Sequence, residues 1–285
     1  MKIFDLHCDT ATRLYNEHRS FDNAVTHINA NTVKGHEVTQ CFAVFFHDGK
    51  RPLPGKDFFL RVADIVKKLR RPGLSPILTG EGVGVLAEEQ GWIDLLKEHN
   101  CRMASLVWNG KNSLATGAAT DDIAPLTEAG RDAVLELLEK NIAIDVSHLS
   151  ARGTEEILSL TDAPIVASHS NARKITPHVR NLSDDTAREI FRRGGIVGLN
   201  LYPPFLSDGE AAVEDILRHA EHFLALGGER GLALGCDLDG VDRLPRGIGH
   251  FGDLPCLHKA FSHAFGETVA NNIFYTNAAR FFGTE

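Results

Sequence analysis

The chain alternates between short apolar runs and stretches in which apolar residues recur every three or four positions. The short runs are rich in Val, Ile, Leu and Phe, which is typical of buried strands. They comprise the start of 2–10 and residues 37–46, 76–79, 102–107, 142–146, 164–167, 195–201 and 232–235. Helical spacing is clearest at 56–71, where Phe59, Val62, Val66 and Leu69 fall on one face. The pattern therefore predicts alternating strands and helices.

Further helices are predicted at 128–140, 211–226, 254–265 and 277–282, and directly after Ser150 and Ser183. Thr127, Ser150 and Ser183 are expected N-caps, because a hydroxyl oxygen at this position accepts a hydrogen bond from a free backbone N–H of the first turn. Asp184 and Asp185 would lie in the first turn after Ser183, where the helix dipole favours negative charge.

Eight strands separated by helices predict an α/β fold, a (β/α)8 TIM barrel. No linker, low-complexity tract or repeat divides the chain, so residues 1–285 are expected to form a single catalytic domain. A doubly wound open sheet is the structural alternative. It has little support, because no G-x-G-x-x-G follows the first strand.

Composition narrows the class of partner. The chain is 43% hydrophobic and 24% charged, with a net charge of −8, which argues against nucleic acid or an anionic membrane surface as a partner. Neither an N-terminal signal pattern nor a run of about 18 apolar residues is found. Five widely spaced cysteines without a C-x-x-C pair favour reduced thiols. We therefore expect a cytoplasmic protein.

Polar residues that can bind metals or substrate follow the predicted strands. Because the C-terminal ends of the strands share one face of a barrel, these residues are expected to converge there. They are His7 and Asp9, Glu81, Trp108 and Asn109, His148, His169, Tyr202 and Asp237. The alternation of side chains along a strand places His7 and Asp9 on one face and Cys8 on the other. Cys8 and Cys236 are thus expected to be small core residues.

Imidazole and carboxylate are ordinary ligands of divalent ions such as zinc. Two histidines, an H-x-D pair and a carboxylate between glycines can hold two ions if one carboxylate bridges them. Each residue alone has a simpler explanation: His148 and His169 as strand-end histidines bonded to backbone, Glu81 as an exposed turn residue. Asp239, followed by Gly240, is best explained as a turn residue. The metal hypothesis therefore depends on the fact that potential ligands follow several of the predicted strands.

The segments FDLHCDT, TGEGVG, IDVSHLS, ASHSNARKITPHVRNLSD and GCDLDG together resemble the membrane dipeptidase (renal dipeptidase) family of zinc metallopeptidases. The resemblance implies a (β/α)8 TIM barrel of the metal-dependent hydrolase type with two Zn2+ or other divalent ions. By resemblance, His7 and Asp9 would bind one ion, His148 and His169 the other, and Glu81 both. The same match places Arg180 on the substrate carboxylate, and Asp237 near its amino group and scissile nitrogen.

The implied reaction is hydrolysis of a dipeptide by a hydroxide that bridges two zinc ions, with Asp237 moving protons to the leaving amine. Family members accept a D-residue at the C-terminal position. The expected partners are a small dipeptide and, at most, a second copy of the chain in a homodimer. One position departs from the mammalian pattern: Trp108 stands where those relatives have a histidine. An indole donates a hydrogen bond but takes up no proton, so we expect Trp108 to be a wall of the pocket.

Two alternatives remain at this stage. The same metal centre would serve an amidohydrolase acting on an N-acyl amino acid or a cyclic amide. The second alternative is a non-catalytic barrel that binds a metal or a peptide. The intact set of five ligands argues against this alternative. A requirement for a free amino group in the substrate distinguishes the dipeptidase from the amidohydrolase.

Overall fold

A computed structural model describes residues 1–48 and 54–284. In this part of the chain a parallel eight-stranded sheet has the order β5-β4-β3-β2-β1-β8-β7-β6. Its strands are β1 (Lys2–Cys8), β2 (Glu37–Phe45), β3 (Leu74–Glu81), β4 (Met103–Ala104), β5 (Ala143–Ile144), β6 (Val166–Ala167), β7 (Ile196–Leu199) and β8 (Leu232–Leu234). A parallel bridge between Asp145 and Val166 joins β5 to β6 and closes the ring. The predicted (β/α)8 barrel is confirmed.

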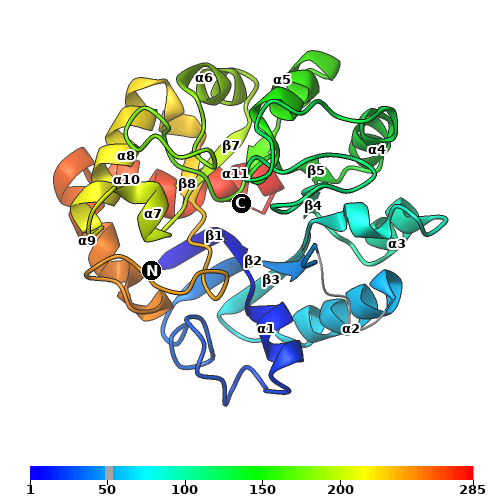
Figure 1. Ribbon diagram of the computed structural model, residues 1–285. Coiled ribbons are helices and arrows are strands. Elements are labelled where there is room, and N and C mark those ends of the chain that lie inside the picture. Colours follow the sequence, from blue (N-terminus) through cyan, green and yellow to red (C-terminus); the bar gives the residue numbers. More distant parts are fainter. Residues whose placement is uncertain (49–53, 285) are drawn as a thin grey trace.

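Helices form a ring around the strands, as Figure 1 shows in a view along the barrel. They are α1 (Thr10–Asn16), α2 (Gly55–Lys68), α3 (Trp92–Glu98), α4 (Glu128–Glu139), α5 (Ala151–Leu160), α6 (Asp184–Arg192), α7 (Pro203–Leu206), α8 (Val213–Ala225), α9 (Leu254–Phe265), α10 (Glu267–Asn271) and α11 (Asn277–Phe282). Short turns η1 (Val83–Leu86), η2 (Gly228–Arg230), η3 (Phe251–Asp253) and η4 (Asn272–Thr276) complete the helical segments. Within the described residues, no helix has the length and apolar character needed to cross a membrane.

The predicted N-caps are confirmed, because the side chains of Thr127, Ser150 and Ser183 each accept a backbone N–H of the helix that follows. Helix α1 has no clear signal in the polar sequence of 11–34. It is held by tertiary contacts instead: Thr12 Oγ1 donates to the Ala43 carbonyl at 3.1 Å and accepts from Phe45 N at 3.0 Å. These bonds fix α1 against β2.

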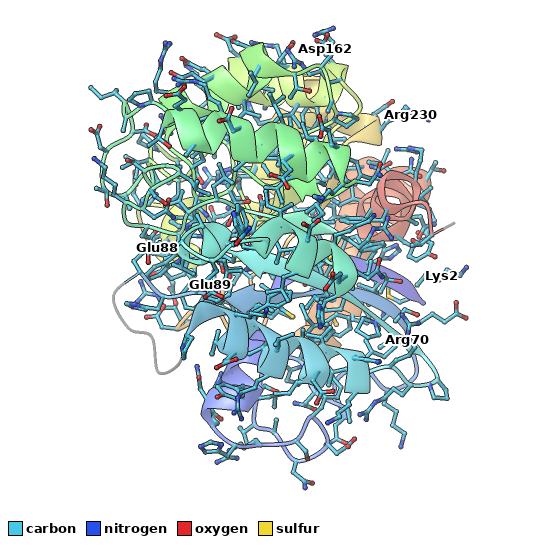
Figure 2. The ribbon with its side chains drawn as sticks, turned by 90° about the vertical axis from the view of Figure 1, so that its right-hand side faces the viewer. Lys2, Arg70, Glu88, Glu89, Asp162 and Arg230 are labelled. Carbon is cyan, nitrogen blue, oxygen red and sulfur yellow. The ribbon has the colours of Figure 1, made fainter. Side chains whose placement is uncertain are left out.

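One end of the barrel is filled by apolar side chains and covered by α11. Phe4, Cys41, Met103, Val166 and Ile196 pack inside the strands together with Ala278, Ala279 and Phe282 of α11. The rings of Phe4 and Phe282 stack with centroids 5.4 Å apart. Figure 2 views the barrel from the side, with Lys2, the first residue of β1, and Arg70 and Arg230, which precede β3 and β8, toward this end and Glu88 and Glu89 toward the other. The inside of the barrel is therefore apolar at the end that α11 covers.

A bulge in β1 turns His7 into the barrel. Asp5 pairs with Gln40 and Cys8 with Phe42, so three steps along β1 match two along β2. Phe4 and Leu6 belong to the cluster inside the barrel, and strict alternation would send His7 outward. The bulge restores His7 to the inside and leaves Cys8 in the core between sheet and helices. The burial of Cys8 and Cys236 agrees with their expected place in the core.

Two glycines allow β6, β7 and β8 to approach closely below the polar end. A Cβ atom on Gly198 or Gly235 would overlap the carbonyl oxygen of Ser168, and the two glycines face each other. Ser168 directly precedes His169. The close packing that these two glycines allow therefore sets the position of the His169 backbone.

Replacing Gly235 by alanine tests this packing. We expect Gly235→Ala to lower the free energy of unfolding by about 2–3 kcal/mol, because the added methyl group must displace the Ser168 backbone. Urea denaturation measures the change. Gly209→Ala is the matched control, since its nearest neighbour would be Ser207 Oγ at 3.8 Å, and a change within about 0.5 kcal/mol is expected. Equal stability of the two variants would contradict the packing argument.

Candidate metal centre

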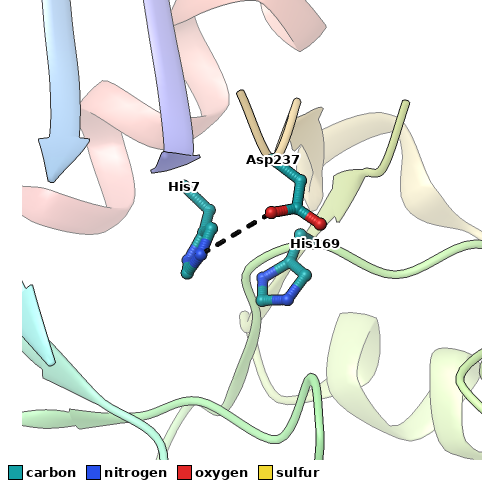
Figure 3. A group of neighbouring side chains, drawn as sticks. All are labelled: His7, His169 and Asp237. Atoms are coloured by element: carbon teal, nitrogen blue, oxygen red, sulfur yellow. Dashed lines mark ion pairs between the residues drawn. The ribbon is translucent and has the colours of Figure 1, made fainter. Parts of the chain in front are cut away.

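Six buried ionisable side chains meet at the C-terminal ends of the strands. They are His7, Asp9, Glu81, His148, His169 and Asp237. Three overlapping groups among them place one ligand atom of each residue within 4.8 Å of the others: His7, His169 and Asp237; Glu81, His148 and His169; and His7, Asp9 and Glu81. Figure 3 shows the first group, in which His7 Nε2 lies 3.9 Å from Asp237 Oδ1. Five of these residues are the ligand set expected from the sequence.

Glu81 lies between the histidines, and its two oxygens face different partners. Oε2 is 3.4 Å from His7 Nε2, whereas Oε1 is 2.8 Å from His148 Nε2 and 3.9 Å from His169 Nε2. Asp9 Oδ2 approaches His7 Nε2 to 3.6 Å. A carboxylate so placed can bind two cations at once, one on each side.

Hydrogen bonds fix the orientation of His148 and His169. His148 Nδ1 is 3.1 Å from Asn109 Oδ1, and His169 Nδ1 is 2.7 Å from Ser168 Oγ. Ser168 Oγ donates to Asp145 Oδ2 at 2.5 Å, so it accepts from His169 Nδ1–H. Asn109 Oδ1 can likewise only accept. Both rings thus carry their proton on Nδ1 when neutral, and both Nε2 atoms present lone pairs.

The donor set fits divalent metal ions. The two Nε2 atoms of His148 and His169 lie 2.9 Å apart, which is unfavourable for two lone pairs unless a cation or proton lies between them. His7 Nε2 and Asp9 Oδ1 are buried without a hydrogen-bond partner among the described residues. Buried polar atoms rarely remain unsatisfied, and imidazole with carboxylate is a common ligand combination for such ions.

The side chains of the cluster strongly shift one another's pKa values. Burial, reinforced by Glu81, raises the pKa of Asp9 to about 6. Burial would raise the pKa of Glu81 too, but the adjacent His7 and His148 lower it below its ordinary value. Burial lowers the pKa of His148 to about 4, with the charge of Arg180 contributing. Burial also tends to lower the pKa of His7, yet Glu81 and Asp9 outweigh it and raise this pKa well above 6.5. Binding a metal at His7 would therefore release a proton.

Asp237 is held in an unusual backbone conformation with one oxygen already bonded. Its φ is +59°, a left-handed value that is uncommon for a residue other than glycine. Asn200 Nδ2 donates to Asp237 Oδ2 at 3.0 Å, which leaves Oδ1 facing His7. Burial raises the pKa of Asp237 to about 7, because Asp9 and Glu81 add to it and His7 offsets it only in part. This carboxyl can gain or lose a proton near neutral pH.

Arg180 is buried near the cluster with free hydrogen-bond donors. Its side chain is only 4% exposed, and Nε and Nη2 have no partner among the described residues. The guanidinium lies over the Phe205 ring at 5.5 Å. Burial lowers the pKa of Arg180 to about 10, although Asp237 and Glu81 oppose this, so the side chain remains a cation at neutral pH. It can bind an anionic group of a ligand.

The other predicted pocket residues have defined neighbours. The Trp108 ring packs 5.0 Å from the rings of both Phe45 and His47 and 6.3 Å from His148, so it lies beside the cluster. Asn109 bonds to His148 through its side-chain oxygen, as described above. The Tyr202 ring packs edge-on against Phe205 at 5.0 Å. Tyr202 thus adjoins the ring that underlies Arg180.

Asp239 has a structural role, in keeping with its expected place in a turn. Its Oδ1 accepts from Arg13 Nη1 at 3.0 Å and from His27 N at 2.7 Å, and its Oδ2 from Thr10 Oγ1 at 2.5 Å. The turn after β8 is thereby tied to α1 and to the segment that follows α1.

Sequence reasoning missed several side chains that orient the cluster. Asp145 is a carboxylate inside the apolar run IAIDV, which is the signal that could have identified it. It accepts hydrogen bonds from both Ser147 and Ser168. Asn200 follows the seventh strand as other site residues follow theirs, but Tyr202 is the residue that the sequence pattern favours there.

A parallel (β/α)8 barrel with buried histidines and carboxylates at the C-terminal ends of its strands has the architecture of a metal-dependent hydrolase. The sequence profile described as membrane dipeptidase (peptidase family M19) matches residues 56–285. The chain belongs to this family, and it is accordingly an enzyme of the metallopeptidase class.

Similar proteins cover different shares of the chain. An uncharacterized protein of Klebsiella pneumoniae is 29% identical over 233 residues, 78% of this chain and 86% of that protein. Dipeptidase aclJ of Aspergillus oryzae is 31% identical over 192 residues, 65% of this chain and 46% of its own length. The chain thus matches less than half of that fungal dipeptidase, and the same holds for an uncharacterized dipeptidase of Schizosaccharomyces pombe, at 43%.

Solved structures share the whole fold. Dipeptidase AC, a metallopeptidase of family M19, is 25% identical with a TM-score of 0.86 and covers 100% of this chain and 97% of that one. A metallopeptidase from Rhodobacter sphaeroides, solved with a phosphinate mimic of the dipeptide L-Ala-D-Ala, is 24% identical with the same TM-score. It covers 100% of this chain and 99% of that one.

The raised pKa of Asp237 predicts a pH-dependent cost of folding without metal. A carboxyl whose pKa rises on folding destabilises the folded state when ionised. This cost is complete above pH 7 and disappears as the pH falls toward 3.8, the ordinary value. In the presence of chelator, Asp237→Asn should therefore raise the free energy of unfolding at pH 8 by about 2 kcal/mol. The difference from the wild type should shrink steadily toward pH 4.

Urea denaturation across this pH range gives the comparison. Asp162→Asn changes an exposed carboxylate and serves as the control, with less than about 0.5 kcal/mol expected. A difference for Asp237→Asn that stays constant with pH, or grows on acidification, would show that Asp237 does not titrate as described.

Proposed function

We propose that the protein hydrolyses free dipeptides with the help of two zinc ions. The observation that carries this proposal is the pairing of a metal-type cluster with Arg180, a buried cation whose donors are free. A cluster alone would serve many hydrolases, whereas a fixed guanidinium beside it selects a substrate with an anionic end. We also infer that residues 1–285 act as one catalytic domain in the cytoplasm. The five free cysteines support this location.

In this proposal His7 and Asp9 would hold one zinc ion, His148 and His169 would hold the other, and Glu81 would contribute to both sites. Two of the groups of ligand atoms support the division, because one joins Glu81 to His7 and Asp9 and another joins it to His148 and His169. Zinc would supply Lewis acidity, lowering the pKa of a water molecule and polarising the peptide carbonyl. Substrate binding and proton transfer would depend on side chains of the protein itself.

Arg180 would hold the C-terminal carboxylate of the dipeptide. A guanidinium offers parallel N–H donors that match the two oxygens of a carboxylate, and such charge-assisted pairs are strong when buried. The free Nε and Nη2 atoms provide these donors. A substrate without a carboxylate would leave the buried cation unpaired, which makes the site selective.

Asp237 would bind the free amino group and move protons at the scissile nitrogen. Its Oδ2 is held by Asn200, and its Oδ1 faces the cluster. A carboxyl with a pKa of about 7 is suited to accept a proton and return it to the leaving amine at neutral pH. Together, Arg180 and Asp237 would fix the distance between the two charged ends and so favour two-residue substrates.

Acceptance of a D-residue at the C-terminal side is a further part of the proposal. The Rhodobacter sphaeroides metallopeptidase with the same fold was solved with a mimic of L-Ala-D-Ala, and this supports testing such substrates. Trp108, with Phe45 and His47, would form an aromatic wall beside His148. Because an indole cannot transfer a proton at working pH, we assign Trp108 to shaping the pocket.

Release of amino acids from a panel of dipeptides, including L-Xaa-D-Xaa pairs, tests the proposal. We expect the zinc-loaded protein to cleave free dipeptides and a chelator to abolish the activity. Acetylation of the substrate amino group should reduce kcat/KM at least about 100-fold, because Asp237 loses its cationic partner.

Equal cleavage of the acetylated substrates would favour an amidohydrolase that acts on N-acyl amino acids. Bound metal without turnover of any amide would instead indicate a non-catalytic barrel. Either result would overturn the dipeptidase proposal.

A further inference from the structure

A second arginine, Arg173, binds the backbone on both sides of Arg180. Its Nη2 donates to the Val179 carbonyl at 2.6 Å, and its Nε donates to the Asn181 carbonyl at 2.7 Å. These are the residues directly before and after Arg180. One guanidinium therefore spans the peptide segment from which the buried Arg180 side chain projects.

The loop that carries Arg180 is closed at its base by main-chain bonds. Arg173 N donates to the Leu182 carbonyl and Leu182 N to the Asn171 carbonyl, both at 2.8 Å. Farther out, Asn181 Nδ2 bonds to the carbonyls of Thr176 and Phe205 at 2.9 Å. The Arg173 side chain adds the bonds that fix the backbone beside Arg180 itself.

Asp122 anchors this arrangement to the rest of the barrel. Its Oδ2 accepts from Arg173 Nη1 at 2.9 Å, and its Oδ1 accepts from the backbone N–H of Ala151, the first residue of α5, at 2.8 Å. The ion pair is partly exposed, so its own contribution to stability is small. Its main effect is geometric, because it links the Arg180 loop to the segment that follows β4.

Arg180 needs such support more than an ordinary surface arginine does. A buried cation with unpaired donors has lost much of its hydration, and a mobile backbone would let the side chain turn toward water. Charge-assisted binding of a carboxylate also depends on orientation, and a displacement of about 1 Å can cost about 100-fold in rate. Rigidity of the loop therefore bears directly on binding.

We propose that Arg173 is a positioning residue that holds Arg180 ready for the substrate carboxylate, and that it thereby sets the selectivity for dipeptides with a free C-terminus. This inference rests on the proposed function, since it deepens the role given there to Arg180. Arg173 itself touches neither the metal-type cluster nor, on this view, the substrate.

Steady-state kinetics with a free dipeptide, together with inhibition by the corresponding dipeptide amide, separates positioning from general stability. The amide lacks the carboxylate and is measured as a competitor, so its Ki needs no turnover. For zinc-loaded Arg173→Met we expect KM for the dipeptide to rise about tenfold with kcat within about twofold, and Ki for the amide to stay unchanged. In the metal-free variant, hydrogen exchange of amides 174–182 should become faster.

Arg193→Met is the matched control. Arg193 also pairs with a carboxylate, Glu189, and bonds to a carbonyl, that of Thr161, but it lies on the far side of α6 from the Arg180 loop in sequence. It should change neither KM nor Ki. Arg173→Lys keeps a charge opposite Asp122 but cannot bond to both carbonyls, so we expect KM close to that of Arg173→Met.

The outcomes distinguish this inference from the proposed function. If Arg180→Met leaves KM for the dipeptide unchanged, the carboxylate role in the proposed function fails. If Arg180→Met raises KM but Arg173→Met does not, Arg173 is not a positioning residue. A parallel loss for dipeptide and amide in Arg173→Met would indicate a structural role only. Should Arg173→Met fail to fold, Asp122→Asn replaces it, with a smaller rise in KM expected and no rise counting against the inference.

Discussion

The structure depends on keeping three carboxylates and three histidines buried together at one end of the barrel. Asp9, Glu81 and Asp237 surround His7, and burial raises the pKa of two of these carboxyls. Like charges in a region of low dielectric repel strongly unless cations lie among them. Two divalent ions would relieve this repulsion and would use the atoms that otherwise lack partners. Metal binding is therefore expected to stabilise the folded barrel.

Other features of the barrel hold this cluster in place. The bulge in β1 directs His7 inward, and Gly198 and Gly235 leave room for the Ser168 backbone. Asn109 and Ser168 accept hydrogen bonds from His148 and His169, and Asn200 donates one to Asp237, so each of these three cluster residues has a fixed orientation. At the opposite end, α11 closes the barrel with apolar side chains. The apolar packing at one end of the barrel therefore holds the strands whose other ends carry the reactive groups.

Much of this could be predicted from the sequence, for a physical reason. Apolar runs separated by capped helices specify a barrel, and the barrel brings strand ends together whatever the details of the loops. The bulge could not be predicted, because it depends on the register between β1 and β2 rather than on residue type. The hydrogen bond between Asn109 and His148 could not be predicted either, because it depends on the path of a loop. Arg173 resembles any loop arginine until its carbonyl partners are known.

We propose above all that one carboxylate, Glu81, joins two metal sites formed by residues from opposite parts of the barrel. Anomalous diffraction from crystals of the zinc-loaded protein tests it most directly. We expect two zinc peaks per chain, one in contact with His7 and Asp9, the other with His148 and His169, and both with Glu81. A single peak, or a second peak away from Glu81, would contradict it.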